Sequence, residues 1–295
     1  MNHLIQRLAA FALLTALAAC GAPQTDTPPP AVPGYEGVQD GAFFIEPVSA
    51  KHLTEHTVRT EVAYNGDEAP GTIVVDTFAR KLYHVMEGGR AMRYGIAVGR
   101  EGLAFRGSGT IGRKQEWPSW TPTANMVRTQ PETYAKYAGG LPGGLDNPLG
   151  ARALYLYRGS RDTMFRIHGT IDNASIGRAT SAGCIRLFNQ DAIHLYNNVT
   201  LGTRVKVRTR EESLAAEGPY MDDAFGRAVP ESPEAIAQKE KDAKALAERE
   251  AREAEEKAKE EARLAKEAEK AERKRLSACK RKGIEAEDCP PAEAV

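Results

Sequence analysis

The chain has 295 residues, of which 40 are Lys or Arg and 40 are Asp or Glu, so its formal net charge is zero. This balance excludes the strongly basic character that indicates a nucleic-acid-binding protein, and no nucleic-acid partner is expected. Four cysteines occur, at Cys20, Cys184, Cys279 and Cys289. They are too few for a small scaffold built on disulfides. The composition changes along the chain, so each region needs its own interpretation.

The first 19 residues have the pattern of a secretory signal peptide. Arg7 and the terminal amine precede an apolar run over 8–19, which is too short to span a bilayer comfortably. The run ends in Leu-Ala-Ala-Cys at 17–20, which resembles the bacterial lipobox, where cleavage precedes a lipidated cysteine. We therefore expect Cys20 to be lipidated and to anchor the protein to a membrane. An ordinary export signal with an incidental cysteine is the alternative.

Residues 20–56 are expected to form the lipidated cysteine and a flexible tether. A Pro-Pro-Pro run at 28–30 lies in sequence that cannot build a core and stays extended. Gly21, rather than Asp, follows the cysteine, and by resemblance to enterobacterial sorting this favours the outer membrane over the inner one. The expected location is the bacterial cell envelope, facing the periplasm.

A β-rich domain is predicted over residues 57–210. Short runs of β-branched and aromatic residues alternate with turn residues, which is typical of hairpins in an antiparallel sheet. The runs expected to be strands lie at 72–76, 81–86, 93–98, 153–157, 165–168 and 204–208. One short helix is expected over 191–197. The predicted fold class is therefore mainly β with short helices, in a domain long enough to bury a core.

The stretch 99–150 shows little periodicity and holds both tryptophans of the chain, Trp117 and Trp120. A loop of this length inside a compact domain is usually functional or disordered. Disordered segments contain few aromatic residues, so an ordered loop that covers a substrate is expected. The alternative is that both indoles cap the sheet.

The segment 165–187 holds residue types suited to nucleophilic catalysis. Cys184 follows Gly183, whose backbone freedom allows a tight turn that points successive N–H groups at one oxyanion. A thiol attacks well only as a thiolate, and an imidazole can take its proton and later give it to a leaving amine. His168 ends a predicted strand nearby. Taken singly, a lone Cys or His is more often structural.

Taken together, His-Gly-Thr at 168–170 and Ser-Ala-Gly-Cys-Ile-Arg at 181–186 resemble the catalytic motif of the L,D-transpeptidase (YkuD-like) family. The resemblance extends over 71–100, 117–156, 188–191 and 202–205. It implies a β-sandwich catalytic domain and a cysteine transpeptidase that acts on peptidoglycan stem peptides. Many members have a second His directly before the Gly of the cysteine motif, where this chain has Ala182.

The resemblance also assigns roles to single residues. Cys184 is the expected nucleophile and His168 the expected general base, with the backbone carbonyl of Gly169 as its orienting partner. The N–H groups of Gly183 and Cys184 are the expected oxyanion hole, and Ser181 is expected near the imidazole.

Arg186 and Trp120 are expected to contact the substrate, Arg186 through a bidentate contact with a carboxylate. A salt bridge that braces the loop is the alternative for Arg186. The sequence shows neither zinc-ligand spacing nor a Gly-rich phosphate loop, so no metal or cofactor is expected. His84 and His194 have no motif partners and are expected to be structural or surface residues.

The implied reaction is acyl exchange on stem peptides. The thiolate attacks the carbonyl of the diamino acid at the third position, expels the terminal D-alanine and passes the acyl group to an amine. Another stem as acceptor gives a 3→3 cross-link, whereas a lipoprotein acceptor becomes attached to the wall. The alternatives are a hydrolase of the same fold, either an amidase or a carboxypeptidase, and a non-catalytic wall-binding lipoprotein. Cys184 and His168 argue against the last of these.

A charged helical tail is predicted over 232–283, after a linker at 211–231 and before a disordered C-terminus at 284–295. Ser232 as N-cap and Pro233 in the first turn are a good helix start, and Gly283 is a suitable end. Large apolar residues are sparse, so a solvated single helix is favoured over a stable coiled coil, and a protein partner of the helix is conceivable. Cys279 and Cys289 can form a disulfide in an oxidising compartment, with free thiols as the alternative.

Overall fold

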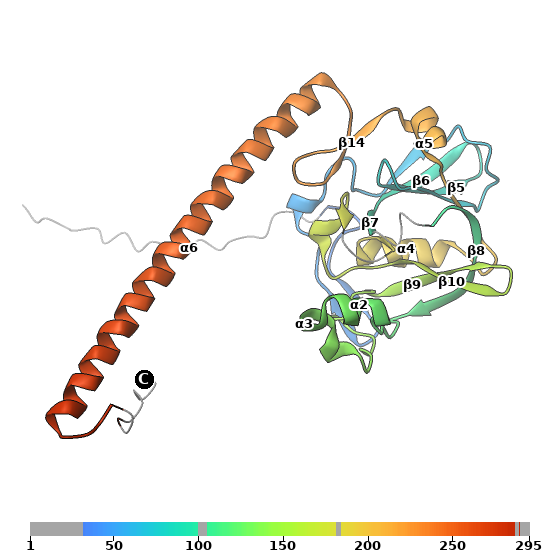
Figure 1. The fold of residues 1–295 in the computed structure, drawn as a ribbon. Coiled ribbons are helices and arrows are strands. Elements are labelled where there is room, and N and C mark those ends of the chain that lie inside the picture. The colour runs from blue at the N-terminus through green and yellow to red at the C-terminus, as the bar shows by residue number, and fades with distance from the viewer. Residues whose placement is uncertain (1–31, 100–104, 181–183, 287–288, 290–295) are drawn as a thin grey trace, which may run out of the picture.

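The computed structural model describes residues 32–99, 105–180, 184–286 and 289. Eleven strands of this part of the chain form one mixed sheet, in the order β11-β7-β12-β10-β9-β8-β13-β4-β5-β6-β3. These strands are β3 (Thr60–Ala63), β4 (Ile73–Asp76), β5 (Lys81–Met86), β6 (Arg90–Gly95), β7 (Ala97–Gly99), β8 (Gly107–Glu116), β9 (Arg152–Arg158), β10 (Arg161–His168), β11 (Ala179–Thr180), β12 (Ile185–Arg186) and β13 (Arg204–Val207). The prediction of a mainly β domain is confirmed (Figure 1).

All six predicted runs contain strands, but the expected antiparallel sheet is mixed. The pairs β10–β12, β11–β7 and β13–β4 are parallel. Strand β8 was not predicted, because Gly107, Gly109 and Gly112 interrupt its pattern. Its backbone nevertheless pairs on both sides, with β9 and with β13. Tertiary pairing therefore overrides the weak local preference of this segment.

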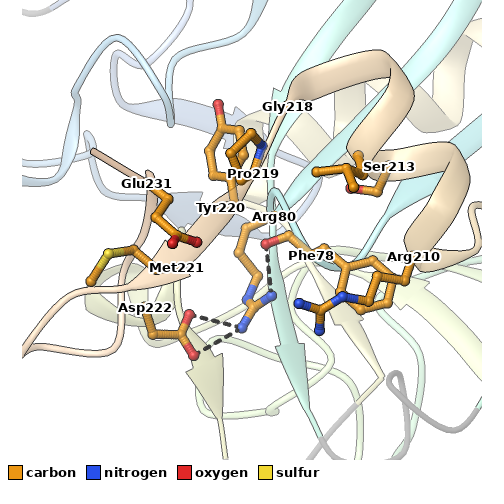
Figure 2. Close-up of a pocket in the computed structure, with 11 residues that line it drawn as sticks. Phe78, Arg80, Arg210, Ser213, Gly218, Pro219, Tyr220, Met221, Asp222 and Glu231 are labelled. Carbon is orange, nitrogen blue, oxygen red and sulfur yellow. Dashed lines mark hydrogen bonds and ion pairs between the residues drawn. The ribbon is translucent and has the colours of Figure 1, made fainter. Parts of the chain in front are cut away.

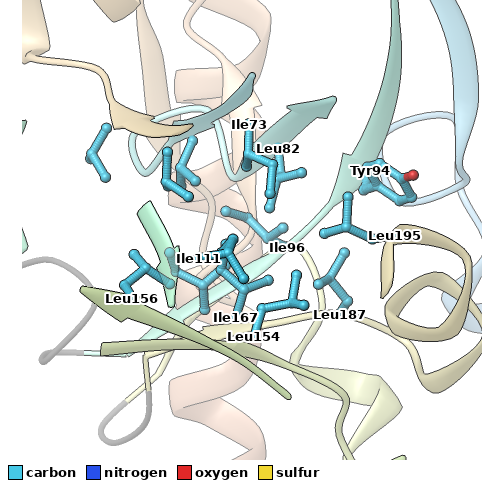
Figure 3. Close-up of a cluster of buried hydrophobic side chains, with 14 of the residues drawn as sticks. Ile73, Leu82, Tyr94, Ile96, Ile111, Leu154, Leu156, Ile167, Leu187 and Leu195 are labelled. Atoms are coloured by element: carbon cyan, nitrogen blue, oxygen red, sulfur yellow. The ribbon is translucent and has the colours of Figure 1, made fainter. Parts of the chain in front are cut away.

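The sheet bends over a single main core, so that its two halves face each other as the layers of a sandwich. Ile73 and Leu82 come from β4 and β5, whereas Leu156 and Ile167 come from β9 and β10, and all four belong to one buried cluster (Figure 3). Helix α4 (Asn189–Asn198) adds Leu195 to the same cluster. These side chains alternate with outward-facing ones along each strand, as the two-residue repeat of a strand requires.

Short helices lie in the long segment before β9. They are α2 (Ala124–Thr129), α3 (Pro131–Tyr134) and the 3-10 turn η2 (Ala135–Tyr137). Figure 1 shows α2 and α3 beside the β9–β10 end of the sheet. The segment expected to be an ordered covering loop therefore has regular local structure.

The described part of the expected tether packs against the domain. It contains β1 (Val38–Asp40) and β2 (Phe43–Ile45), which form a hairpin, and the 3-10 turn η1 (Ala50–His52). Tyr35 is 1% exposed and its ring meets Phe188 at 5.6 Å between centroids. Its hydroxyl donates to Asp191 Oδ2 at 3.1 Å. Residues 1–31, with the expected signal peptide and Cys20, lie outside the described residues.

The segment expected to be a linker at 211–231 also folds onto the sheet. It holds most of α5 (Arg210–Glu217) and the hairpin of β14 (Tyr220–Asp222) and β15 (Ala228–Pro230). Glu217 accepts from Lys81 Nζ at 2.7 Å and from Arg208 Nη1 at 2.8 Å, and all three side chains are largely buried. Sequence reasoning missed this because the contact with Lys81 joins residues 136 positions apart.

A hollow of about 190 Å³ lies between α5 and β14 (Figure 2). Arg80 reaches across it to Asp222, with Nη2 3.1 Å from Oδ1. Arg80 adopts a positive φ of 55°, and its guanidinium also donates to the carbonyls of Thr77 and Phe78. The cationic group thus clamps the C-terminal hairpin to the β4–β5 turn.

The predicted long helix is confirmed as α6 (Pro233–Arg281). Ser232 caps it, with the hydroxyl accepting from the Ala235 N–H at 3.1 Å, and Gly283 follows it with a positive φ of 70°. Figure 1 shows α6 as a rod that extends away from the sheet. Cys279, which forms a disulfide with Cys289, is the single buried residue of α6.

We expect the chain that ends after Glu231 to keep the stability of the whole protein. It retains the Glu217 and Asp222 contacts, whereas a chain that ends after Arg210 loses both, so that Lys81 loses its ion-pair partner and Arg208 keeps only Asp76. Removing one partner of a buried ion pair costs about 3–5 kcal/mol. Thermal melts of the two truncated proteins and the full chain measure this difference. A low melting temperature for the longer truncation would show that α6 contributes to the domain.

Candidate active site

The outer face of strands β9, β10 and β12 carries the polar side chains of the site. Leu154, Leu156 and Ile167 point into the core, so their neighbours Tyr155 and His168 point the other way. His168 ends β10 and pairs in parallel register with Arg186 of β12. The strand register therefore brings together two residues that the motif separates in sequence.

A single backbone contact fixes the orientation of His168. Its Nδ1 lies 2.7 Å from the carbonyl oxygen of Gly169, the next residue. A carbonyl can only accept, so Nδ1 carries the proton and donates. In the neutral ring, Nε2 is then left with its lone pair, which is the form that can take a proton from another group.

His168 is held neutral by its surroundings. Burial, followed by the positive charges of Arg186 and Arg166, lowers its pKa from the ordinary 6.5 to about 4, although the contact with Gly169 acts in the opposite direction. The side chain is only 4% exposed. At neutral pH the ring is therefore a proton acceptor and not a cation.

Cys184 and His168 line the same cavity, which has a volume of about 310 Å³. Cys184 is the free cysteine of the described residues and is partly exposed. Its Sγ lies 3.8 Å from the carbonyl oxygen of Met164, which has a positive φ of 64° beside a bulge in β10. Trp120 and Leu149, from the segment 99–150 that was expected to cover a substrate (the covering segment), also line the cavity.

A second cavity of about 210 Å³ adjoins the first, because His168, Trp120 and Leu149 line both. Arg186 lines this second cavity, as do aromatic and apolar residues of the covering segment, among them Tyr134 and Tyr137. The Trp120 ring meets both tyrosine rings edge-on at about 6 Å. Both cavities therefore reach His168.

The two tryptophans have different surroundings. Trp120 faces the cavities, whereas Trp117 is held by the N-terminal hairpin: its Nε1 donates to Asp40 Oδ2 at 2.8 Å and its ring contacts Phe43 at 4.3 Å. Asp40 also receives two hydrogen bonds from Arg152, at 2.6 and 2.8 Å. The hairpin thus anchors the start of the covering segment to β9.

Asn189 joins the two backbone segments on either side of the site. Its Oδ1 accepts from the N–H of Ala151 at 2.9 Å, and its Nδ2 donates to the carbonyl of Thr170 at 3.0 Å. A Cβ on Gly169 would lie 2.1 Å from Oδ1, and one on Gly150 would lie 2.2 Å from it. Both glycines are therefore needed to make room for this amide, which sits directly beside the peptide that orients His168.

Ser181 and Gly183 lie outside the described residues. The same is true of Ala182. His84 and His194 do not line either cavity, and His194 Nδ1 lies 2.8 Å from the hydroxyl of Tyr94. Among residues 32–99, 105–180, 184–286 and 289, no three His, Cys, Asp or Glu side chains gather so that they could hold a metal ion.

Sequence reasoning missed Arg113, Tyr155 and Arg166, which also line the cavity of Cys184. In the run 153–157, Tyr155 lies on the other face of the strand from Leu154 and Leu156. That alternation could have indicated an outward-facing ring. The two arginines could not be placed, because their positions depend on bulges in β8 and β10.

The model of the YkuD family, described as the L,D-transpeptidase catalytic domain, matches residues 70–207. A putative L,D-transpeptidase of Fuscovulum blasticum is 41% identical over 137 residues, which are 46% of this chain and 68% of that protein. This chain belongs to the L,D-transpeptidase family. The probable L,D-transpeptidase ErfK/SrfK of Escherichia coli (strain K12) is 37% identical over 138 residues, and the match spans 43% of that relative's length.

A solved structure from Brucella melitensis, named a probable carnitine operon oxidoreductase, is 46% identical over 52% of this chain and 96% of that chain, with a TM-score of 0.38. An L,D-transpeptidase from Mycobacterium smegmatis is 19% identical over 47% of this chain and 58% of that chain, with a TM-score of 0.35. The family assignment rests on the sequence relatives and not on these two superpositions.

In this L,D-transpeptidase domain, we expect Asn189→Ala to destabilise the fold and to slow alkylation of Cys184. The variant leaves the N–H of Ala151 and the carbonyl of Thr170 buried without a partner, at a cost of about 2–3 kcal/mol. Asn198→Ala is the matched control, because Asn198 lies on the same helix and, within the described part of the chain, its side chain bonds only to the carbonyl of His194 in that helix. Urea unfolding and iodoacetamide kinetics measure the two effects. Equal behaviour of the two variants would contradict the role given to Asn189.

We also expect His168 to make the domain less stable in acid. Its pKa is about 4 in the folded protein and near 6.5 in the unfolded chain, so the unfolded chain takes up the proton first as the pH falls. The contribution of neutral His168 to the free energy of unfolding is complete above pH 6.5 and is lost as the pH falls toward 4.

Urea unfolding at pH 7 and pH 4.5 tests this. The loss of stability in His168→Gln should be smaller than in the wild type by about 2 kcal/mol, since glutamine does not titrate. Some loss remains in the variant, because burial also lowers the pKa of His194 to about 4. Identical losses in both proteins would show that His168 titrates normally.

Proposed function

We propose that this chain is a peptidoglycan L,D-transpeptidase that works through a covalent acyl-cysteine. The observation that carries the proposal is the pair of Cys184 and His168 in one cavity, with Nδ1 of the imidazole committed to the Gly169 carbonyl. A neutral ring with a free Nε2 beside a partly exposed thiol is the arrangement that nucleophilic catalysis requires. The membership of the family supports the substrate class.

In the first step, Nε2 of His168 takes the proton of the Cys184 thiol, and the thiolate attacks the carbonyl of the third residue of a stem peptide. A sulfur–carbon bond forms and the carbonyl oxygen gains the negative charge. The N–H groups of Gly183 and Cys184 are proposed to stabilise that charge. When the intermediate collapses, the carbon–nitrogen bond breaks and the imidazolium gives its proton to the departing D-alanine amine.

In the second step, an acceptor amine attacks the thioester and loses a proton to His168, and the sulfur leaves as the Cys184 thiolate. The donor and the acceptor are proposed to approach the imidazole through the two cavities that His168 lines. An amine on another stem yields a 3→3 cross-link, and an amine on a protein attaches that protein to the wall. Water in its place yields a hydrolysed peptide.

Arg186 and Trp120 are proposed to contact the substrate. Both line the second cavity, where the aromatic walls suit an apolar part of a peptide and the guanidinium suits a carboxylate. Asp146 lines the same cavity and can hold an amine of opposite charge. This cavity therefore fits a chain that carries both kinds of charge.

We further propose that the enzyme is a lipoprotein of the bacterial envelope, anchored through Cys20 and facing the periplasm. The lipobox-like sequence at 17–20 supports the anchor. The disulfide between Cys279 and Cys289 supports an oxidising compartment. In the described part of the chain, no helix has the length and apolar character needed to cross a membrane. The α6 rod is proposed to space the enzyme or to contact a protein partner.

The central test uses purified protein and stem peptides, with mass spectrometry of the products. Wild type should release D-alanine and join the acyl group to an added amine, whereas Cys184→Ala should fold normally and do neither. His168→Gln should keep the thiol but lose activity by about 10²-fold or more, the usual effect of a positioned general base. Substantial turnover by Cys184→Ala would remove the covalent mechanism, and a product made only with water would identify a hydrolase.

A further inference from the structure

Two arginines stack against the ring of Tyr155 in the cavity of Cys184. The guanidinium carbon of Arg113 lies 3.7 Å from the ring centroid, and that of Arg166 lies 4.2 Å from it. Strand β9 carries Tyr155 between β8 and β10, so one arginine comes from each neighbouring strand. The reaction proposed above gives neither arginine a role.

A bulge puts Arg113 on this face. In a regular strand Ile111 and Arg113 would share a face, yet Ile111 is fully buried in the core opposite Leu156, whereas Arg113 pairs with Tyr155. The extra residue between them is Gly112, where a Cβ would lie 2.3 Å from the Tyr157 ring. One additional glycine thus turns the arginine away from the core and toward the cavity, the usual effect of a bulge.

The two guanidiniums differ in their partners. Arg166 is held by Asp162 through two hydrogen bonds of 2.7 and 2.9 Å, so its charge is balanced. Arg113 has no ion pair within the described part of the chain and is exposed to the cavity. Its stacking on Tyr155 fixes the plane of the group and leaves the N–H edges free. A guanidinium held in this way can donate two parallel hydrogen bonds to a planar anion such as a carboxylate.

We propose that Arg113 binds a carboxylate of the acyl-donor peptide while the scissile carbonyl lies at Cys184. The proposal rests on the proposed transpeptidase function and names a specificity residue for it. Among the residues that the structure describes, no carboxylate lines this cavity, whereas the guanidinium groups of Arg113 and Arg166 do. A carboxylate that enters therefore meets one unpaired charge.

Two carboxylates of the donor have the required chemistry. One is the C-terminal carboxylate of the leaving residue, and the other is the side-chain carboxylate of the third residue when that residue is a diamino dicarboxylic acid. Both lie within one residue of the attacked carbonyl. Replacing each in turn with a carboxamide keeps the shape of the peptide and removes only the charge, so the two peptides identify which carboxylate Arg113 contacts.

The experiment compares three donor peptides, the parent and the two carboxamides, with wild type, Arg113→Gln and Arg113→Lys. We expect Arg113→Gln to lower kcat/KM for the parent by roughly 10- to 100-fold, the effect of a lost charge-assisted hydrogen bond. The loss should be several times smaller for one carboxamide, because its contact is already absent. Arg113→Lys should restore part of the activity on the parent. Arg158→Gln is the matched control, since Arg158 stacks on Phe105 outside this cavity, and it should lower none of the three values.

Binding of the same peptides to Cys184→Ala, with and without Arg113→Gln, gives a readout that needs no turnover. The carboxamide that escapes the kinetic effect should bind both proteins equally, while the parent should lose roughly 10-fold in affinity when Arg113 is replaced. Equal losses for all three peptides, or none, would overturn the proposal. Failure of wild type to turn over any peptide would count against the proposed function, and the binding comparison would still decide the role of Arg113.

Discussion

The site depends on the hydrogen bond between Nδ1 of His168 and the carbonyl of Gly169. The contact selects the tautomer that leaves Nε2 free, and no carboxylate is needed to do so. A carboxylate partner would stabilise the imidazolium and raise the pKa, whereas a neutral carbonyl gives direction with a weaker pull on the proton. The ring consequently stays neutral under the combined effect of burial and the nearby arginines.

The backbone next to that carbonyl is held by more distant parts of the chain. The side chain of Asn189 bonds to the backbone after Gly150, at Ala151, and after Gly169, at Thr170. Asn189 is also the first residue of α4, the helix that packs Leu195 into the main core. The sandwich therefore fixes α4, α4 fixes Asn189, and Asn189 holds the carbonyl of Thr170, one residue beyond the carbonyl that orients His168. Each of these steps rests on close packing of groups that have little room to move. A rigid path of this kind is what a site needs to hold its groups within a fraction of an ångström.

The parts of the site that the sequence could predict are local. Cys184, His168 and Gly169 lie in short motifs, and the resemblance of those motifs to a family is what assigned their expected roles. Arg113 could not be predicted, because its face depends on a one-residue bulge and on the register between β8 and β9. Strand β8 was missed for a related reason: its glycines are poor strand formers, and only pairing on both edges gives them a strand conformation.

The contrast between local sequence patterns and distant contacts also explains why the two ends of the domain were not predicted. Residues 32–56 and 211–231 contain no long periodic run, so local sequence indicated a tether and a linker. Their contacts are instead made with distant residues, both apolar, as between Tyr35 and Phe188, and polar, as between Lys81 and Glu217. Partners of this kind leave no periodic pattern in the sequence, although they bury well once the sheet brings them together.

Helix α6 is where the prediction from local sequence succeeded most fully, because this helix depends on local interactions. Ion pairs three or four residues apart, such as Arg263 with Glu260 and Glu267, lie along its surface, and each contributes about 0.2–0.5 kcal/mol. At 1.5 Å per residue its 49 residues span roughly 75 Å. The buried residue of α6 is Cys279, which packs against Cys289 and not against the sheet. We therefore expect any influence of α6 on activity to act through where the domain is held, and not through the geometry around His168.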